Sequence, residues 1–177
     1  MPQQLDLIRH ATPDWNRKDI PYHLPPGPPL TEQGLAEAQA LAYFLRQAEI
    51  KYIYCSPLER CLKTAEIVSE AVGAPVEVVQ GLMELQPGEE TASIRDRVYP
   101  AFEKASVHSQ ESGPVALITH GGPVDFLLSA LGLEVSPLRI FDHRNVVPPA
   151  GAWLACRQDT SQPWELRLVF KPDLTPA

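Results

Sequence analysis

Short apolar runs alternate with segments of helical periodicity along most of this chain, and this alternation constrains the fold more than any other feature. Each run is too short for a helix and is typical of a strand buried in a sheet. The runs cover residues 5–8, 52–55, 76–79 and 115–119. A helical segment follows each run, and this order of elements predicts an α/β fold with a mostly parallel sheet.

Signals in the connecting segments place the helices. Thr31 can cap a helix whose apolar stripe extends to about residue 48. Ser56 begins a capping box, with proline at the first helical position, for a helix that ends at Gly73. Two further helices are predicted, one over residues 92–109 and one that follows residue 122 and closes at Gly132.

The C-terminal part departs from this alternation. Residues 152–156 and 164–170 flank a turn region and predict an antiparallel hairpin at the sheet edge. The complete order of elements predicts a three-layer α/β/α sandwich, with a mostly parallel sheet and an antiparallel C-terminal edge hairpin. A length of 177 residues suits a single domain, which we expect to span residues 1–177.

Composition narrows the possible partners. The net charge is −7 and no long basic run occurs, which argues against a nucleic-acid surface. We find neither a signal peptide nor an apolar run long enough to span a bilayer, so we expect a cytoplasmic protein with no membrane partner. Three cysteines without metal-ligand spacing are interpreted as reduced core thiols. An edge hairpin with apolar faces is compatible with a homodimer.

Two histidines occupy the same place in this pattern, directly after a buried strand. Arg9 and His10 follow the first run, and His120 follows the run at 115–119. The carboxyl ends of strands in open α/β sheets are where ligands bind. Gly121, next to the second histidine, lets backbone N–H groups approach a ligand closely.

Arg60 lies in the first turn of a predicted helix, where the helix dipole is unfavourable for a cation unless an anion is nearby. An exposed arginine paired with Glu59 or Asp14 is the simpler alternative. If the strands are neighbours, however, several cationic or potentially cationic groups converge, namely Arg9, His10, Arg60 and His120. Such a cluster favours a multivalent anion, and a phosphoryl group held by bidentate arginines fits it best.

The chemistry of such a cluster follows from its charges. Nearby arginines lower the pKa of a histidine and keep its imidazole neutral, so that it can attack phosphorus and form a phosphohistidine. Glu84, after the third run, is the candidate general acid for the leaving oxygen. Other carboxylates compete for that role: Glu89, Glu90 and Asp125. We predict neither a metal site nor a cofactor, because no ligand cluster accompanies the histidines in sequence and arginines repel a cation.

Several motifs in order resemble the histidine phosphatase superfamily, in its phosphoglycerate-mutase-like branch. They are Arg9-His10 after an apolar strand, Trp15-Asn16, the segments 29–34 and 56–65, and residues 119–122. The resemblance implies that His10 is the phosphorylated nucleophile, that Asn16 contacts phosphate or substrate and that Glu84 donates a proton. It also implies a phosphate pocket formed by Arg9, Arg60 and His120.

The chain departs from the family pattern after Glu84. Pro87 and Gly88 follow almost at once, where longer members carry a helical insertion that covers the active site. We therefore expect a shortened lid near residues 84–92 and an open pocket in which water can reach a phosphohistidine. This favours a metal-independent phosphatase acting on small phosphate monoesters. The alternatives are a phosphoglycerate mutase, a protein phosphohistidine phosphatase and, outside the enzymes, a phosphate-binding pseudoenzyme.

Overall fold

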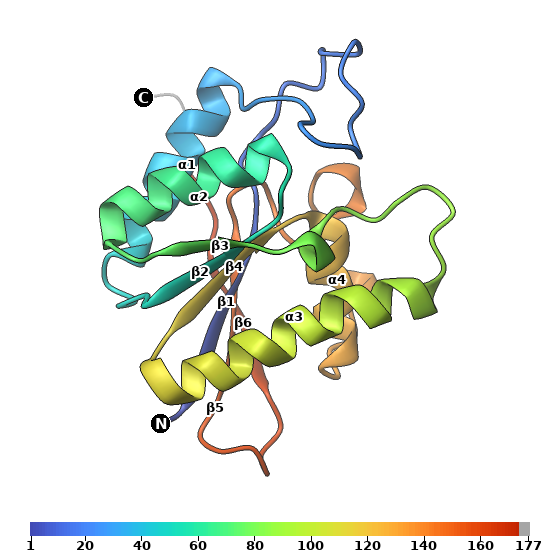
Figure 1. Cartoon of the computed structure of the whole chain (residues 1–177). Coiled ribbons are helices and arrows are strands. Elements are labelled where there is room, and N and C mark those ends of the chain that lie inside the picture. Colours follow the sequence, from blue (N-terminus) through green and yellow to red (C-terminus); the bar gives the residue numbers. More distant parts are fainter. Residues whose placement is uncertain (174–177) are drawn as a thin grey trace.

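The computed structural model describes residues 1–173, which contain one six-stranded sheet of order β3-β2-β4-β1-β5-β6 (Figure 1). Four strands are parallel, whereas β5 runs antiparallel to both β1 and β6. The strands are β1 (Gln3–Arg9), β2 (Tyr52–Cys55), β3 (Val76–Val78), β4 (Val115–Thr119), β5 (Ala152–Arg157) and β6 (Glu165–Phe170). The predicted antiparallel edge hairpin is therefore confirmed as β5 and β6.

Helices cover both faces of the sheet and complete the predicted three layers (Figure 1). One face carries α1 (Glu32–Leu45) and α2 (Glu59–Val72), and the other carries α3 (Thr91–Ser112) and α4 (Gly121–Ala130). Short 3-10 helices occur at Gln80–Leu82, Ser136–Leu138 and Asp142–Arg144. No helix within residues 1–173 is long and apolar enough to cross a membrane.

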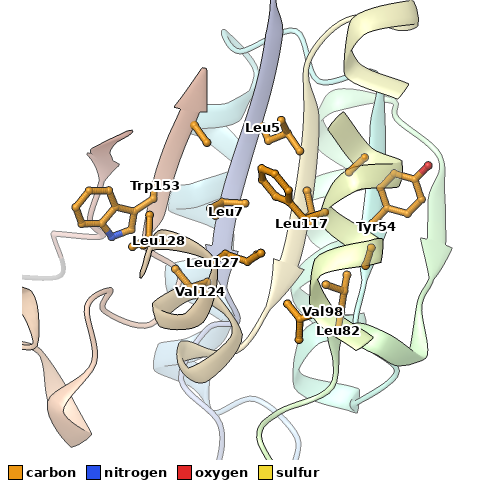
Figure 2. Close-up of a cluster of buried hydrophobic side chains, with 14 of the residues drawn as sticks. Leu5, Leu7, Tyr54, Leu82, Val98, Leu117, Val124, Leu127, Leu128 and Trp153 are labelled. Carbon is orange, nitrogen blue, oxygen red and sulfur yellow. The ribbon is translucent and has the colours of Figure 1, made fainter. Parts of the chain in front are cut away.

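The core lies on both sides of the central strands because successive side chains of a strand point to opposite faces. Leu5 and Leu7 of β1 pack with α3 and α4, and Figure 2 shows them beside Leu117 of the neighbouring strand. Ile8 packs on the opposite side, against α1 and α2. These side chains have no exposed surface. Complete burial of one such aliphatic side chain contributes about 1.5–3 kcal/mol to folding, which explains why the central strands are mostly apolar, although Asp6 of β1 is buried among them.

The sequence signals predict two helix termini correctly and a third wrongly. Thr31 caps α1 by accepting the backbone N–H of Gly34 at 2.9 Å, and Gly73 ends α2 in the left-handed region at φ 72°. The predicted capping box at Ser56 is wrong, because α2 begins at Glu59 without a side-chain cap. The Ser56 hydroxyl instead lies 2.7 Å from a ring nitrogen of His120.

The cysteines differ from the sequence interpretation at one position. All three are free thiols, and Cys55 and Cys61 are buried as expected. Cys156 is only partly buried, because it lies near the end of β5 toward the edge of the sheet. The prediction that Cys156 is a core thiol is therefore wrong.

Candidate active site

The sheet brings the two sequence-predicted histidines together. Strands β1 and β4 are parallel neighbours, with Arg9 opposite Thr119, so His10 and His120 leave the sheet side by side. Their ring centroids are 5.1 Å apart in an edge-to-face arrangement. Strand β2 flanks β4 on its other side, and α2 after it carries Arg60 to the same place. We call His10, Arg60 and His120 the buried cluster, since each is at most 1% exposed.

His10 presents a lone pair at its Nε2 atom. Its Nδ1 lies 2.7 Å from the carbonyl oxygen of Ala11, which can only accept, so Nδ1 carries the proton. Nε2 in turn accepts a hydrogen bond from Nε of Arg60 at 3.2 Å. Burial, reinforced by Arg60 and Arg9, holds the pKa of His10 well below its usual value. The ring is therefore a neutral imidazole with a defined nucleophilic nitrogen.

Arg60 is buried and has no carboxylate partner within the described part of the chain. Its Nη1 donates to the carbonyl oxygen of Tyr22 at 2.9 Å, and its guanidinium lies 4.1 Å from the centre of the Tyr22 ring. Its Nη2 has no hydrogen-bond partner among residues 1–173. An unsatisfied buried donor costs about 1–3 kcal/mol, more when it is charged. The alternative of an exposed arginine paired with Glu59 or Asp14 is thus wrong, and an anion would satisfy the free donor.

Arg9 is also buried, at 3% exposed, but its charge is already balanced. Its Nη1 and Nη2 donate to the two carboxylate oxygens of Asp142 at 2.7 and 2.8 Å. Nη1 also donates to the carbonyl oxygen of Val147 at 3.0 Å. The two arginines that the sequence placed together therefore differ, since one is paired with a carboxylate and the other is not.

His120 joins the cluster to Glu84. Its Nε2 lies 2.7 Å from the Ser56 hydroxyl, and its Nδ1 lies 3.8 Å from a carboxylate oxygen of Glu84. Burial, followed by the influence of His10, keeps the pKa of His120 well below its usual value. Burial also raises the pKa of the Glu84 carboxyl, which favours the protonated acid. The neighbouring Cys61 thiol stays neutral because burial raises its pKa to about 12.

The competing carboxylates are used elsewhere. Glu89 forms a bidentate pair with Arg97 at 2.6 and 2.7 Å, and this hydrogen bonding lowers its pKa to about 2. Asp125 forms a similar pair with Arg139. Glu90 is exposed where α3 begins. Of the four candidates, the structure brings only Glu84 to the histidines.

A cavity of about 540 Å³ opens beside the buried cluster. Its inner wall includes Arg9, Glu84 and Gly121. The outer wall comes from two loops, residues 14–28 and 141–145, which we call the rim (Figure 1, dark blue and orange loops). Asn16 is exposed and does not line this cavity, so the structure does not bring it to the other predicted residues. Its role as a substrate contact stays a prediction.

Residues 5–90 and 84–148 match the model of the histidine phosphatase superfamily (branch 1). The chain belongs to this superfamily. The resemblance of its motifs to the phosphoglycerate-mutase-like branch is thereby confirmed, and the buried cluster lies within the matched residues.

Curated relatives of this superfamily member include both mutases and phosphatases. A segment of 82 residues is 35% identical to the 2,3-bisphosphoglycerate-dependent phosphoglycerate mutase of Thermoplasma acidophilum, covering 46% of this chain and 41% of that protein. A segment of 87 residues is 34% identical to the adenosylcobalamin/alpha-ribazole phosphatase of Salmonella typhimurium, covering 49% of this chain and 42% of that protein. The chain thus spans about two fifths of the length of these relatives.

The fold of this superfamily member extends over nearly all of a solved relative. The mycobacterial glucosyl-3-phosphoglycerate phosphatase superimposes with a TM-score of 0.76 at 21% identity, covering 95% of this chain and 98% of that one. At this identity the similarity establishes a shared fold.

The tertiary structure also gathers a set of groups that could ligate a metal, which sequence spacing did not reveal. One ligand atom each from His10, Glu84 and His120 lies within 4.8 Å of the others. The set does not fit a cation well, because the lone pair of His10 Nε2 is already turned toward the Arg60 guanidinium. A dication there would face two buried arginines at short range.

Two site residues of this superfamily member were missed by sequence reasoning, since Asp142 and Ser56 each contact a predicted residue from a distant part of the chain. No local pattern identifies either residue as a partner. Residues of the rim loops, such as Tyr22 and Asn145, are visible in the sequence as possible substrate contacts. In the structure Tyr22 contacts Arg60, and Asn145 lies against Gly121, where an added Cβ would come within 1.6 Å of the Asn145 Oδ1.

Proposed function

We propose that this protein is a metal-independent phosphatase that hydrolyses small phosphate monoesters through a phosphohistidine at His10. The observation that carries the proposal is the neutral Nε2 of His10 beside the unpartnered, buried Nη2 of Arg60. A phosphoryl oxygen that accepts from the Arg60 guanidinium satisfies this donor. It also replaces the Arg60 hydrogen bond to His10 and frees the Nε2 lone pair.

The reaction then proceeds in two displacements. In the first, His10 Nε2 bonds to phosphorus while the bond from phosphorus to the ester oxygen breaks, and Glu84 gives its proton to that oxygen. In the second, Glu84 takes a proton from water, whose oxygen bonds to phosphorus as the bond to nitrogen breaks. The raised pKa of Glu84 suits an acid that is reprotonated in each cycle.

The short connection after Glu84 supports hydrolysis over phosphoryl return to the substrate. Residues 85–90 alone separate Glu84 from the first residue of α3. Little chain remains there to close the cavity, so water can compete for the phosphohistidine. A phosphoglycerate mutase is the second candidate, since relatives of both kinds match this chain.

The direct test is hydrolysis of 4-nitrophenyl phosphate in the presence of EDTA, with the wild type beside His10→Ala. His108→Ala is the matched control, because that histidine lies on α3 and contacts Tyr54 outside the cavity. We expect chelation to leave turnover intact, His10→Ala to abolish it and the control to retain it. Brief reaction with labelled substrate and separation under alkaline conditions would trap the acid-labile phosphohistidine on the wild type.

Two outcomes would contradict the proposal. Full activity of His10→Ala would show that His10 is not the nucleophile. Activity that is lost on chelation and restored by added metal would show that the mechanism depends on a metal ion. Incubation with 3-phosphoglycerate and catalytic 2,3-bisphosphoglycerate separates the mutase, which forms 2-phosphoglycerate, from a phosphatase, which releases inorganic phosphate.

A further inference from the structure

The rim of the cavity is built largely from rings and apolar side chains. Tyr22 and Trp15 are half-buried in its wall, and Ile20, Pro21 and Pro28 line it beside them. His143 reaches the same wall from the other rim loop, with its ring 5.1 Å from that of Trp15 in an edge-to-face contact. The rim thus offers flat aromatic surface from two separate segments of the chain.

This aromatic wall begins next to the reacting atoms. Arg60 donates to His10 through Nε at 3.2 Å and to the Tyr22 carbonyl through Nη1 at 2.9 Å, so a single guanidinium separates the two residues. Burial raises the pKa of the Tyr22 hydroxyl, opposed by smaller effects of Arg60 and Trp15, so the ring is a neutral phenol. A group joined to the phosphorus through one oxygen therefore meets neutral rings first.

Charges at the rim largely cancel. Arg17 is held by both carboxylate oxygens of Asp19 at 2.9 and 2.8 Å. Asp14 and Lys18 supply one charge of each sign to the lining, while Arg144 is exposed and does not line the cavity. A leaving group that carries a carboxylate or a second phosphate would need an uncompensated cation to hold it, and the two arginines of the lining, Arg9 and Arg17, are each paired with a carboxylate.

The size of the cavity exceeds what a phosphoryl group requires. Its volume of about 540 Å³ lies in the range of pockets that enclose whole small molecules, about 300–1,000 Å³. His10, Arg60 and His120 do not themselves line the cavity, and a phosphoryl group beside Arg9 and Glu84 would fill only a small part of this volume, which leaves the rest for the organic part of an ester.

We infer that the rim is a leaving-group subsite for a flat, uncharged aromatic or heteroaromatic group. This inference rests on the proposed function for the role of the phosphate, and it separates this chain from a phosphoglycerate enzyme, whose substrate is small and acidic. Trp15 is the principal specificity residue of the subsite, because its ring joins both rim loops.

The test compares 2-phenylethyl phosphate with ethyl phosphate, whose alcohols are similarly basic, so that chemical reactivity does not decide the result. We expect kcat/KM to favour the phenyl ester by about tenfold, as one ring transferred onto an aromatic wall predicts. The preference should disappear in Trp15→Ala and persist in Trp15→Phe. Tyr43→Ala is the matched control, since that ring is 70% exposed on α1, and it should keep the wild-type preference.

Binding of the matching phosphonates, followed by calorimetry, tests the subsite without turnover. Tighter binding of 2-phenylethylphosphonate than of ethylphosphonate, lost in Trp15→Ala, would support the subsite even if neither ester is hydrolysed, and only the proposed function would then fail. Equal binding and equal kcat/KM for the two compounds in the wild type would overturn the subsite while hydrolysis stands. The subsite would also be overturned if Trp15→Ala weakened the binding of both phosphonates equally. Trp15→Phe keeps a ring at this position, so normal binding by this variant would show that the rim loop tolerates substitution at residue 15.

Discussion

The buried cluster and the rim meet where Arg60 contacts Tyr22, beside the same cavity, but different features of the chain fix them. His10 and His120 leave adjacent parallel strands whose register is set by apolar side chains on both faces. The rim comes from two loops, and one of them contains consecutive residues, His143 and Arg144, in the left-handed region at φ 52° and 58°. Tertiary contacts hold such a conformation, because local preference opposes it in residues other than glycine.

This difference indicates a division of roles. The sheet holds the groups proposed for chemistry in place, while the loops supply charge balance through Asp142 and the rings of the outer wall. Substitutions in the buried cluster should therefore affect the reaction of every substrate. Substitutions in the rim should change affinity and selectivity by smaller factors.

The strongest test of this division is Arg60→Lys. Lysine keeps the positive charge but places it on a single nitrogen, which cannot reach the Tyr22 carbonyl and hold phosphoryl oxygens with the planar, forked geometry of the Arg60 guanidinium. We expect kcat/KM to fall by about 10²- to 10³-fold for all phosphate esters, as on loss of a preorganised electrostatic contact. Arg139→Lys, in an exposed pair with Asp125, is the matched control. Equal losses of kcat/KM in the two variants would show that Arg60 has no specific role in the reaction.

Glu84→Gln tests the acid at the edge of the cluster. We expect the rate of the first turnover with ethyl phosphate to fall by about 10²-fold or more, since its alkoxide needs a proton. The first-turnover release of nitrophenolate from 4-nitrophenyl phosphate should change much less, because nitrophenolate leaves unprotonated, although later turnovers of both esters still need Glu84 as a base. An equal loss of the first-turnover rate with both esters would indicate that Glu84 positions another group.

The pH profile follows from the same pKa shifts. Glu84 acts as an acid only while protonated, so the rate should decline as pH rises through its raised pKa. His10 attacks only while neutral, and its lowered pKa keeps it so well into the acidic range. The phosphorylation rate of the wild type should therefore fall on the alkaline side of its pH profile. In single-turnover measurements with ethyl phosphate, the rate of Glu84→Gln should not show this alkaline decline.

Asp142→Asn tests the charge balance that the rim provides. The substitution leaves the Arg9 guanidinium uncompensated, so inorganic phosphate should bind about three- to tenfold more tightly. The inhibition constant of phosphate measures this directly. Asp125→Asn removes a carboxylate from a bidentate arginine pair outside the cavity and should leave that constant unchanged. Weaker phosphate binding in Asp142→Asn would mean that Asp142 mainly orients Arg9.

The smallest effect is expected from Gly121→Ala. A Cβ at this position would come within 1.6 Å of Asn145 Oδ1, and the flexible amide should swing away and lose its bond to the Asp142 carbonyl. We expect a loss of about 1 kcal/mol in the free energy of unfolding. In an Asn145→Ala background the same substitution should cost almost nothing, which a double-mutant cycle measures. If Gly121→Ala lowered the free energy of unfolding by the same amount in the Asn145→Ala background, the added methyl group would instead disturb the backbone of α4.

The layers and the position of the buried cluster follow from the amino-acid sequence. Apolar periodicity fixes which residues form strands, and the polar residues at the strand ends then lie at one edge of the sheet. The periodicity therefore predicts that His10, Arg60 and His120 lie together when their strands are neighbours, which the structure shows. That prediction assumes that β1 and β4 are neighbours, since strand order is not encoded locally.

The choice of partners among the polar groups depends on the packed chain. Asp142 reaches Arg9 across 133 residues of sequence, and Ser56 turns to His120 although its local motif favours a helix cap. The Ser56 hydroxyl keeps only a long contact of 3.5 Å from the backbone N–H of Leu58, while its short hydrogen bond is to the buried imidazole. The same reasoning applies to the metal-like grouping of His10 and His120 with Glu84, whose spacing along the chain carries no sign of it. Periodicity reports on burial of whole elements, whereas pairing depends on distances that exist only after those elements have packed.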